Sequence, residues 1–82
     1  DIVFKRGKKS YAIEVETGAG LSKVSRMKEK LKVLEDYDKW FFVVTDRNKV
    51  KAYKEFGQSV DLRYLKPYLS GFLRQISHSQ SA

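Results

Sequence analysis

Residues 2–16 read IVFKRGKKSYAIEVE, and this stretch decides the fold. Segments 2–5 and 10–16 are rich in β-branched and aromatic side chains, which is typical of β-strands. The four residues between them, Arg6-Gly7-Lys8-Lys9, are a turn signal between two strand-like runs. The stretch therefore predicts a β-hairpin.

The turn predicts the register of this hairpin. Gly7 at the first central position of a two-residue turn suits a type II′ geometry, which sets Phe4 opposite Tyr11 and Asp1 opposite Glu14. Because side chains alternate along a strand, we expect two distinct faces. One carries Asp1, Val3, Lys5, Ala12, Glu14 and Glu16, and the other carries Ile2, Phe4, Tyr11, Ile13 and Val15. We expect the second face to be core and the first to present three acids.

A crossover unit follows the hairpin. Residues 17–20 (TGAG) break the strand, and residues 21–36 have the apolar spacing of an amphipathic helix. That apolar stripe consists of Leu21, Val24, Met27, Leu31 and Leu34. Residues 40–44 (WFFVV) are an unbroken apolar run of strand length, as expected for a central strand covered on both faces. A strand, a helix and a strand in this order predict parallel pairing with residues 10–16, hence a mixed sheet.

The rest of the chain predicts further small elements of one α/β domain spanning residues 1–76. Asp46 suits the cap of a short helix at 47–56, and residues 58–61 suit a short edge strand. Residues 62–76 have a helical pattern that Pro67 starts or kinks, and residues 77–82 form a polar tail. We also expect the chain to be a fragment that lacks a helix upstream of residue 1.

Composition restricts the class of protein. The 82 residues suffice for one domain with one active surface. The chain has no cysteine, which excludes a disulfide framework and thiol catalysis and is compatible with the cytoplasm. No apolar run approaches the roughly 20 residues that span a bilayer. The net charge of +7 predicts a polyanionic partner such as nucleic acid, although a solvated, lysine-rich surface would give the same charge.

The acidic face of the hairpin predicts a metal site. Directly opposed residues on antiparallel strands lie close together, and like charges there are destabilising. Grouped carboxylates such as Asp1, Glu14 and Glu16 are ligands for Mg²⁺ or Mn²⁺, which would remove the repulsion. The alternative is that the acids are solvated at a strand end and pair with Lys5 or Lys23.

The order of these elements resembles a known family. Asp1, a short hairpin, Glu14-Val15-Glu16 after an Ala-Ile strand, a crossover helix and an apolar strand are similar to the core of the PD-(D/E)XK nuclease superfamily. That superfamily includes restriction endonucleases and archaeal Holliday-junction resolvases. The likeness covers about residues 1–45 and implies a restriction-endonuclease-like core. Small nuclease-like domains of archaeal proteins, often beside DNA-translocating ATPases, are similar too.

The resemblance implies roles for individual residues. Asp1 and Glu14 would be metal ligands, and Glu16 stands where the family usually has lysine. Glu16 would then be a further ligand or the base that takes a proton from water. The electrostatic role of the missing lysine would pass to Lys23, Lys30 or Lys5. The implied reaction is metal-assisted hydrolysis of phosphodiester bonds.

Three functions are compatible with these residues: a metal-dependent DNA nuclease, an inactive nuclease-fold module that binds DNA or assists assembly, and an interaction domain with a basic face. DNA contacts would come from Lys5, Lys8, Lys9, Lys23, Arg26, Lys28 and Lys30, unless the helical lysines merely face solvent. Because the family usually has more elements, we expect a homodimer, or a longer protein such as an ATPase, to complete the site.

Overall fold

The computed structural model describes residues 2–81, with side chains described as far as Ile76. It is a small α/β fold around one four-stranded mixed sheet in the order β1-β2-β3-β4. The strands are β1 (Ile2–Arg6), β2 (Lys9–Glu16), β3 (Lys39–Val44) and β4 (Ser59–Asp61). The helices are α1 (Val24–Leu34), α2 (Val50–Lys54) and α3 (Leu65–Ser81), each preceded by a 3₁₀ turn: η1 (Ala19–Ser22), η2 (Arg47–Lys49) and η3 (Leu62–Tyr64).

The predicted hairpin and its register are confirmed within the described residues. β1 and β2 are antiparallel, with Phe4 opposite Tyr11 and Ile2 opposite Ile13. Gly7 has a φ of 65°, and no non-glycine residue between 2 and 81 has a positive φ, so Lys8 keeps the negative φ that a type II′ turn requires. Asp1, which the same register would set opposite Glu14, lies outside the described residues.

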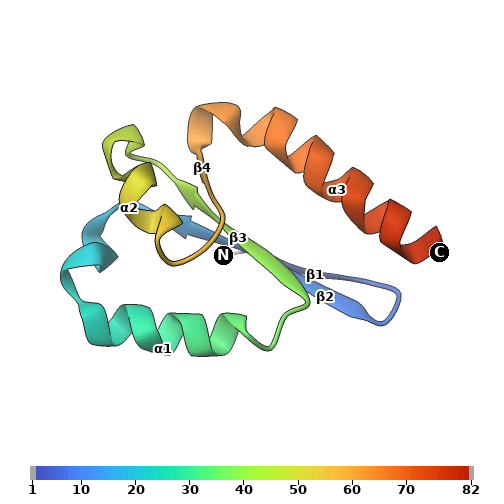
Figure 1. The fold of residues 1–82 in the computed structure, drawn as a ribbon, viewed down its shortest axis with the longest axis horizontal. Helices are drawn as coiled ribbons and strands as arrows, with labels where there is room; N and C mark the ends of the chain where they lie inside the picture. The colour runs from blue at the N-terminus through green and yellow to red at the C-terminus, as the bar shows by residue number, and fades with distance from the viewer. Residues whose placement is uncertain (1, 82) are drawn as a thin grey trace.

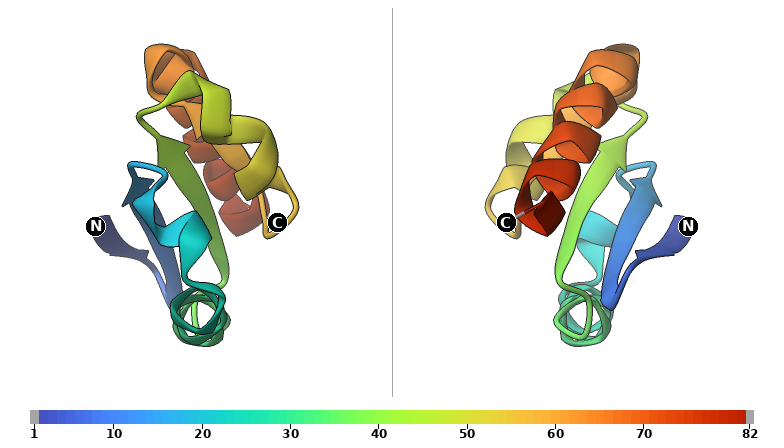
Figure 2. Two further views of the ribbon diagram at one scale, coloured as in Figure 1. Left: turned by 90° about the vertical axis from the view of Figure 1, so that its left-hand side faces the viewer. Right: turned by 90° about the vertical axis from the view of Figure 1, so that its right-hand side faces the viewer.

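The sheet has a core on each face. Tyr11 and Ile13 of β2 pack with Phe72 and Ile76 of α3 on one face. On the other face Ala12 packs beneath α1 and α2, in a cluster that also contains Met27, Leu34, Phe42, Val44 and Tyr53. Figure 1 shows the strands running between α1 below and α3 above, and Figure 2 gives the two end views. The face expected only to present acids is thus also a packed face.

β3 is the central strand that its apolar run predicts. It pairs in parallel with β2 on one side and with β4 on the other. Its residues from Phe41 to Val44 are at most 1% exposed, because helices cover both faces of the sheet. β4 is the short edge strand expected near residues 58–61. Asp46 caps η2 as expected, its side chain accepting a hydrogen bond from the Asn48 amide.

The helices differ from the predicted bounds at their ends. The crossover helix begins at Val24 instead of residue 21, because η1 and the extended backbone of Lys23 precede it. Val24, predicted to lie on the apolar stripe, is 62% exposed. Pro67 lies in the first turn of α3, where a helix loses no backbone hydrogen bond to proline. α3 runs through Ser81, so most of the segment interpreted as a tail is helical. Within residues 2–81, no helix is both long and apolar enough to cross a bilayer.

Candidate functional site

Glu14 and Glu16 occupy the carboxyl-terminal half of β2, on the face that α1 covers. They alternate with Val15, which points to the other face and is 43% exposed. In the parallel pairing with β3 they stand beside Phe42 and Val44, two fully buried residues. The side chain of Glu14 is 12% exposed and that of Glu16 is 9% exposed. Both carboxylates are therefore largely removed from water.

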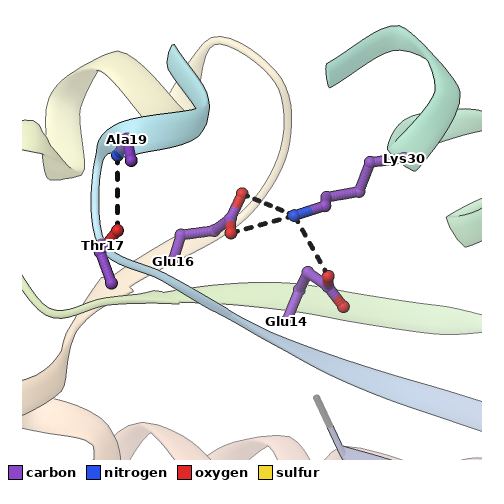
Figure 3. A network of polar contacts seen from close by, with 5 residues as sticks. All are labelled: Glu14, Glu16, Thr17, Ala19 and Lys30. Atoms are coloured by element: carbon purple, nitrogen blue, oxygen red, sulfur yellow. Dashed lines mark hydrogen bonds and ion pairs between the residues drawn. The ribbon is translucent and has the colours of Figure 1, made fainter. Parts of the chain in front are cut away.

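Lys30 of α1 neutralises part of this buried negative charge. Its Nζ donates to both carboxylate oxygens of Glu16, at 3.1 Å to Oε1 and 3.0 Å to Oε2. The same Nζ lies 3.4 Å from Oε1 of Glu14. Figure 3 shows the ammonium between the two carboxylates. The three residues, which we call the Glu14–Glu16–Lys30 cluster, hold two negative charges and one positive charge.

The pKa of Lys30 is shifted by this arrangement. Burial is the largest single influence and lowers the pKa, but the hydrogen bonds and charges of Glu16 and Glu14 together outweigh it. The net result is that the pKa of Lys30 is raised above its ordinary value of 10.5. The side chain is therefore an ammonium at every physiological pH.

The cluster lies in an open cleft of about 610 Å³ between the hairpin, α1 and the loop after β2. Apolar residues such as Ala12, Met27 and Leu34 line part of the cleft, and Glu29 and Arg26 of α1 add further charges. Val3, Val33 and Tyr37 complete its apolar rim. A small polar molecule or one phosphate group therefore has direct access to the cluster.

The loop after β2 shapes one end of the cleft. The hydroxyl of Thr17 accepts a hydrogen bond from the Ala19 amide at 3.4 Å, and Gly18 has a φ of 102°, a conformation that favours glycine (Figure 3). A Cβ on Gly20 would lie 3.6 Å from Oε1 of Glu16 and 3.8 Å from the hydroxyl oxygen of Tyr53. The backbone thus approaches Glu16 closely from above the sheet.

Tyr53 of α2 lies beneath the same loop, and its hydroxyl group is buried. Within the described part of the chain, this buried oxygen has no hydrogen-bond partner. Burial and the nearby charge of Glu16 raise the pKa of Tyr53, whereas the backbone N–H of Gly18, which faces the hydroxyl oxygen without reaching hydrogen-bond geometry, and the charge of Lys30 oppose the shift. The hydroxyl is therefore neutral and adds no charge to the site.

The carboxylates suit a divalent cation in chemistry but are not arranged as a complete ligand set. Glu14 and Glu16 supply the hard oxygen donors that Mg²⁺ and Mn²⁺ prefer. Among the side chains described, from Ile2 to Ile76, no group of three or more His, Asp or Glu residues gathers as metal ligands would. The third predicted ligand, Asp1, lies outside the described residues. Two ligands thus fit the ion, and water and substrate oxygens would have to complete its shell.

One expectation about the acids is corrected for Glu14 and Glu16. The alternative that these two acids are solvated and pair with Lys5 or Lys23 is wrong, because both side chains are largely buried and Lys30 pairs with them. The opposed pair of Asp1 and Glu14, whose repulsion was the reason to expect a metal, includes a residue outside the described part of the chain. The difference arises because α1, whose placement depends on tertiary packing, lies directly over the acidic face.

The structure brings only some of the other predicted site residues together. Arg26 lines the cleft beside Lys30, but Lys5, Lys23 and Lys28 are exposed and do not line it. Lys8 and Lys9 lie at the hairpin turn, and Lys9 is seven positions from Glu16 along β2. At a rise of about 3.3 Å per residue that separation is on the order of 20 Å. The basic residues therefore do not form one contiguous surface with the cluster.

Reasoning from sequence missed the cleft residues Glu29, Thr17 and Tyr37. From sequence, residues 17–20 are predicted mainly as a turn that breaks the strand. Lys30, expected from sequence with Lys23 and Lys5 for the electrostatic role, lies three residues after Met27 and four before Leu34, so a helix places it on the face that packs on the sheet. Comparison with protein-family models, with curated proteins and with solved structures finds no match to this chain.

Proposed function

We propose that this chain is a metal-dependent DNA nuclease domain that hydrolyses phosphodiester bonds in the cleft beside Glu14 and Glu16. The observation that supports this function best is the convergence of two carboxylates and one ammonium inside an open cleft. The sequence resemblance implies the same chemistry from Asp1, Glu14 and a lysine in the position of Glu16. Here the ammonium comes from Lys30 of α1 instead.

Each residue of the cluster has a role in this proposal. Glu14 and Glu16 would hold Mg²⁺ or Mn²⁺ through their oxygens, with Glu16 alternatively acting as the base that accepts a proton from water. When bound, the cation supplies the positive charge that polarises a phosphate group and acidifies water. Lys30, kept protonated by its acidic neighbours, places a second positive charge where negative charge develops on phosphate oxygens.

The net charge of +7 supports DNA as the substrate, because a positive field attracts polyanions and raises their encounter rate at low salt. The cleft is open to solvent, and its volume of about 610 Å³ admits a phosphate with its flanking sugars. Hydrolysis would therefore occur at the surface of the domain, on a backbone that lies across the cleft.

A second function is an inactive nuclease-fold module that binds DNA or assembles with a larger DNA-processing protein. One observation favours it: the Lys30 ammonium already contacts three of the carboxylate oxygens that a cation would use. Binding a cation would require Lys30 to move. In the inactive module the cluster would instead be a structural ion pair between α1 and β2.

A cleavage assay separates the two functions. We expect the chain to cut labelled single-stranded, duplex or branched DNA in Mg²⁺ or Mn²⁺, and EDTA to stop the reaction. Glu14→Gln and Lys30→Met should each lower the rate by about 100-fold or more, whereas Glu35→Gln, at the far end of α1, should not. DNA binding without any cleavage would contradict the nuclease and support the inactive module.

A further inference from the structure

A second hollow lies at the carboxyl ends of β3 and β4. Its volume is about 420 Å³, and it is lined by side chains from η2, α2, β4 and η3. Its polar lining includes Arg47, Asn48, Lys54, Asp61, Arg63 and Tyr64, and we call this set the strand-end surface. Its three cationic side chains outnumber the single carboxylate, so the surface is positively charged. None of these residues belongs to the DNA-contacting set expected from sequence.

The sheet register connects the strand-end surface to the cleft. Glu16 pairs with Val44, and Val44 pairs with Asp61, so the three residues form one row on the face beneath α1 and α2. Neighbouring strands lie about 4.8 Å apart, which places the ends of β2 and β4 on the order of 10 Å from each other. Figure 1 shows β2 and β3 pointing towards the same end of the molecule, beside α2.

Lys49 of η2 follows Arg47 and Asn48 of the strand-end surface in sequence and contacts the loop after β2. The Cβ that Gly18 lacks would lie 3.0 Å from Cγ of Lys49, so this lysine stem packs against the loop that shapes the cleft. Its side chain is exposed, as is that of the neighbouring Arg47. Cationic groups therefore continue along the sheet edge from the cleft to the strand-end surface.

Arg63 contacts both Asp61 and Tyr64 within the strand-end surface. Nε and Nη2 of Arg63 donate to Oδ2 of Asp61, at 3.2 and 3.0 Å, and its guanidinium lies over the ring of Tyr64, 5.4 Å from the centroid. Tyr64 is nevertheless 58% exposed. Arg63 covers one face of the ring, and an exposed ring next to cationic side chains is the combination on which unpaired bases stack.

We infer that an unpaired strand of DNA binds the strand-end surface, with a base stacked on Tyr64 and a phosphate at Arg47. The strand continues past Lys49 towards the Glu14–Glu16–Lys30 cluster. A duplex does not fit this chemistry, because its base faces are already stacked and cannot reach a tyrosine ring. That the ligand is DNA rests on the proposed function. That the bound form is an unpaired strand is inferred from the strand-end surface.

Fluorescence anisotropy in EDTA tests this site without cleavage. The probes are a labelled oligothymidylate and a labelled duplex of the same length. We expect Tyr64→Ala to weaken single-strand binding by about 5-fold or more, and Tyr64→Phe, which keeps the ring, to bind like wild type. Arg47→Ala should weaken binding and lower the salt slope by about 0.7. Lys39→Ala, at the opposite end of β3 and outside the lining of both hollows, is the control that should change little.

Two outcomes would overturn the inference. Tyr64→Ala could bind the single strand as tightly as wild type, or it could lose duplex and single-strand binding equally. Glu14→Gln separates this inference from the proposed nuclease, because it should abolish cleavage and leave single-strand binding intact. If wild type never cuts DNA while Tyr64→Ala still loses single-strand binding, the nuclease fails and the binding site stands.

Discussion

Lys30 donates to both carboxylate oxygens of Glu16, at 3.1 and 3.0 Å, although the two residues lie 14 positions apart in sequence. The contact ties the middle of α1 to the carboxyl end of β2 and closes one side of the cleft. Because both side chains are mostly removed from water, this pair differs from an ordinary surface salt bridge. We therefore expect the Lys30–Glu16 pair to affect both the stability of the fold and the proposed cleavage reaction.

Lys30→Met should destabilise the fold, because it leaves two buried carboxylates without their cation. Because the Lys30 side chain is one-third exposed, we expect the free energy of unfolding to fall by about 2 kcal/mol. This lies between the typical costs of breaking a surface salt bridge and a buried one. Urea unfolding followed by circular dichroism measures it. Lys28→Met, an exposed position on the same helix, is the matched control. Equal stability of the two variants would contradict the role of Lys30.

The contribution of Lys30 to the free energy of unfolding should fall at alkaline pH. The pKa of Lys30 is raised in the folded state, so this contribution is complete below the ordinary pKa of 10.5. It is lost as the pH rises through the pKa of Lys30 in the folded protein. The difference in unfolding free energy between wild type and Lys30→Met should stay constant from about pH 8 to about pH 10 and then shrink. A difference that grows above that range would contradict the assigned shift.

Gly57 and Gly71 should respond to alanine in opposite directions. A Cβ at Gly57 would overlap the indole of Trp40, which packs against Phe42, so Gly57→Ala should cost about 1–3 kcal/mol. At Gly71, inside α3, nothing lies within 4 Å of an added Cβ. Gly71→Ala should therefore stabilise the chain by about 0.5–1 kcal/mol. Thermal melts of both variants measure the two effects, and a stabilised Gly57→Ala would show that the Trp40 packing is wrong.

Tyr53→Phe should not destabilise the protein. The hydroxyl of Tyr53 is buried without a hydrogen-bond partner in the described residues, so removing it removes a desolvation cost. We expect stability to be unchanged or to rise by up to about 1 kcal/mol. Differential scanning calorimetry provides the measurement. A loss above about 1 kcal/mol would show that the hydroxyl has a structural partner after all.

Much of the fold could be predicted from local patterns. Gly7 in a two-residue turn and the alternation of residues 11–16 predicted the hairpin register within residues 2–16. The apolar run of residues 40–44 identified the buried central strand. These signals are local and strong, because a slip of one residue in an alternating strand would turn its core side chains to solvent.

Local sequence patterns could not predict which lysine pairs with Glu14 and Glu16. Lys23 and Lys30 both follow the spacing of Met27 and Leu34, so helical periodicity alone leaves them equivalent. They differ because η1 occupies residues 19–22 and the helix begins only at Val24, which leaves Lys23 outside its first turn. That boundary depends on how the loop packs over Glu16 and Tyr53, which is a tertiary effect. The strand-end surface was missed for the same reason, since only the sheet brings Arg47 and Arg63 together.

Titration with Mn²⁺ tests whether Glu14 and Glu16 are metal ligands and needs no knowledge of the DNA substrate. We expect one Mn²⁺ to bind per chain by isothermal titration calorimetry, with a rise in melting temperature at saturating metal. Both effects should be lost in the double variant Glu14→Gln, Glu16→Gln and retained in Glu35→Gln. Absence of binding by wild type, or equal binding by the double variant, would contradict the assignment of Glu14 and Glu16 as metal ligands.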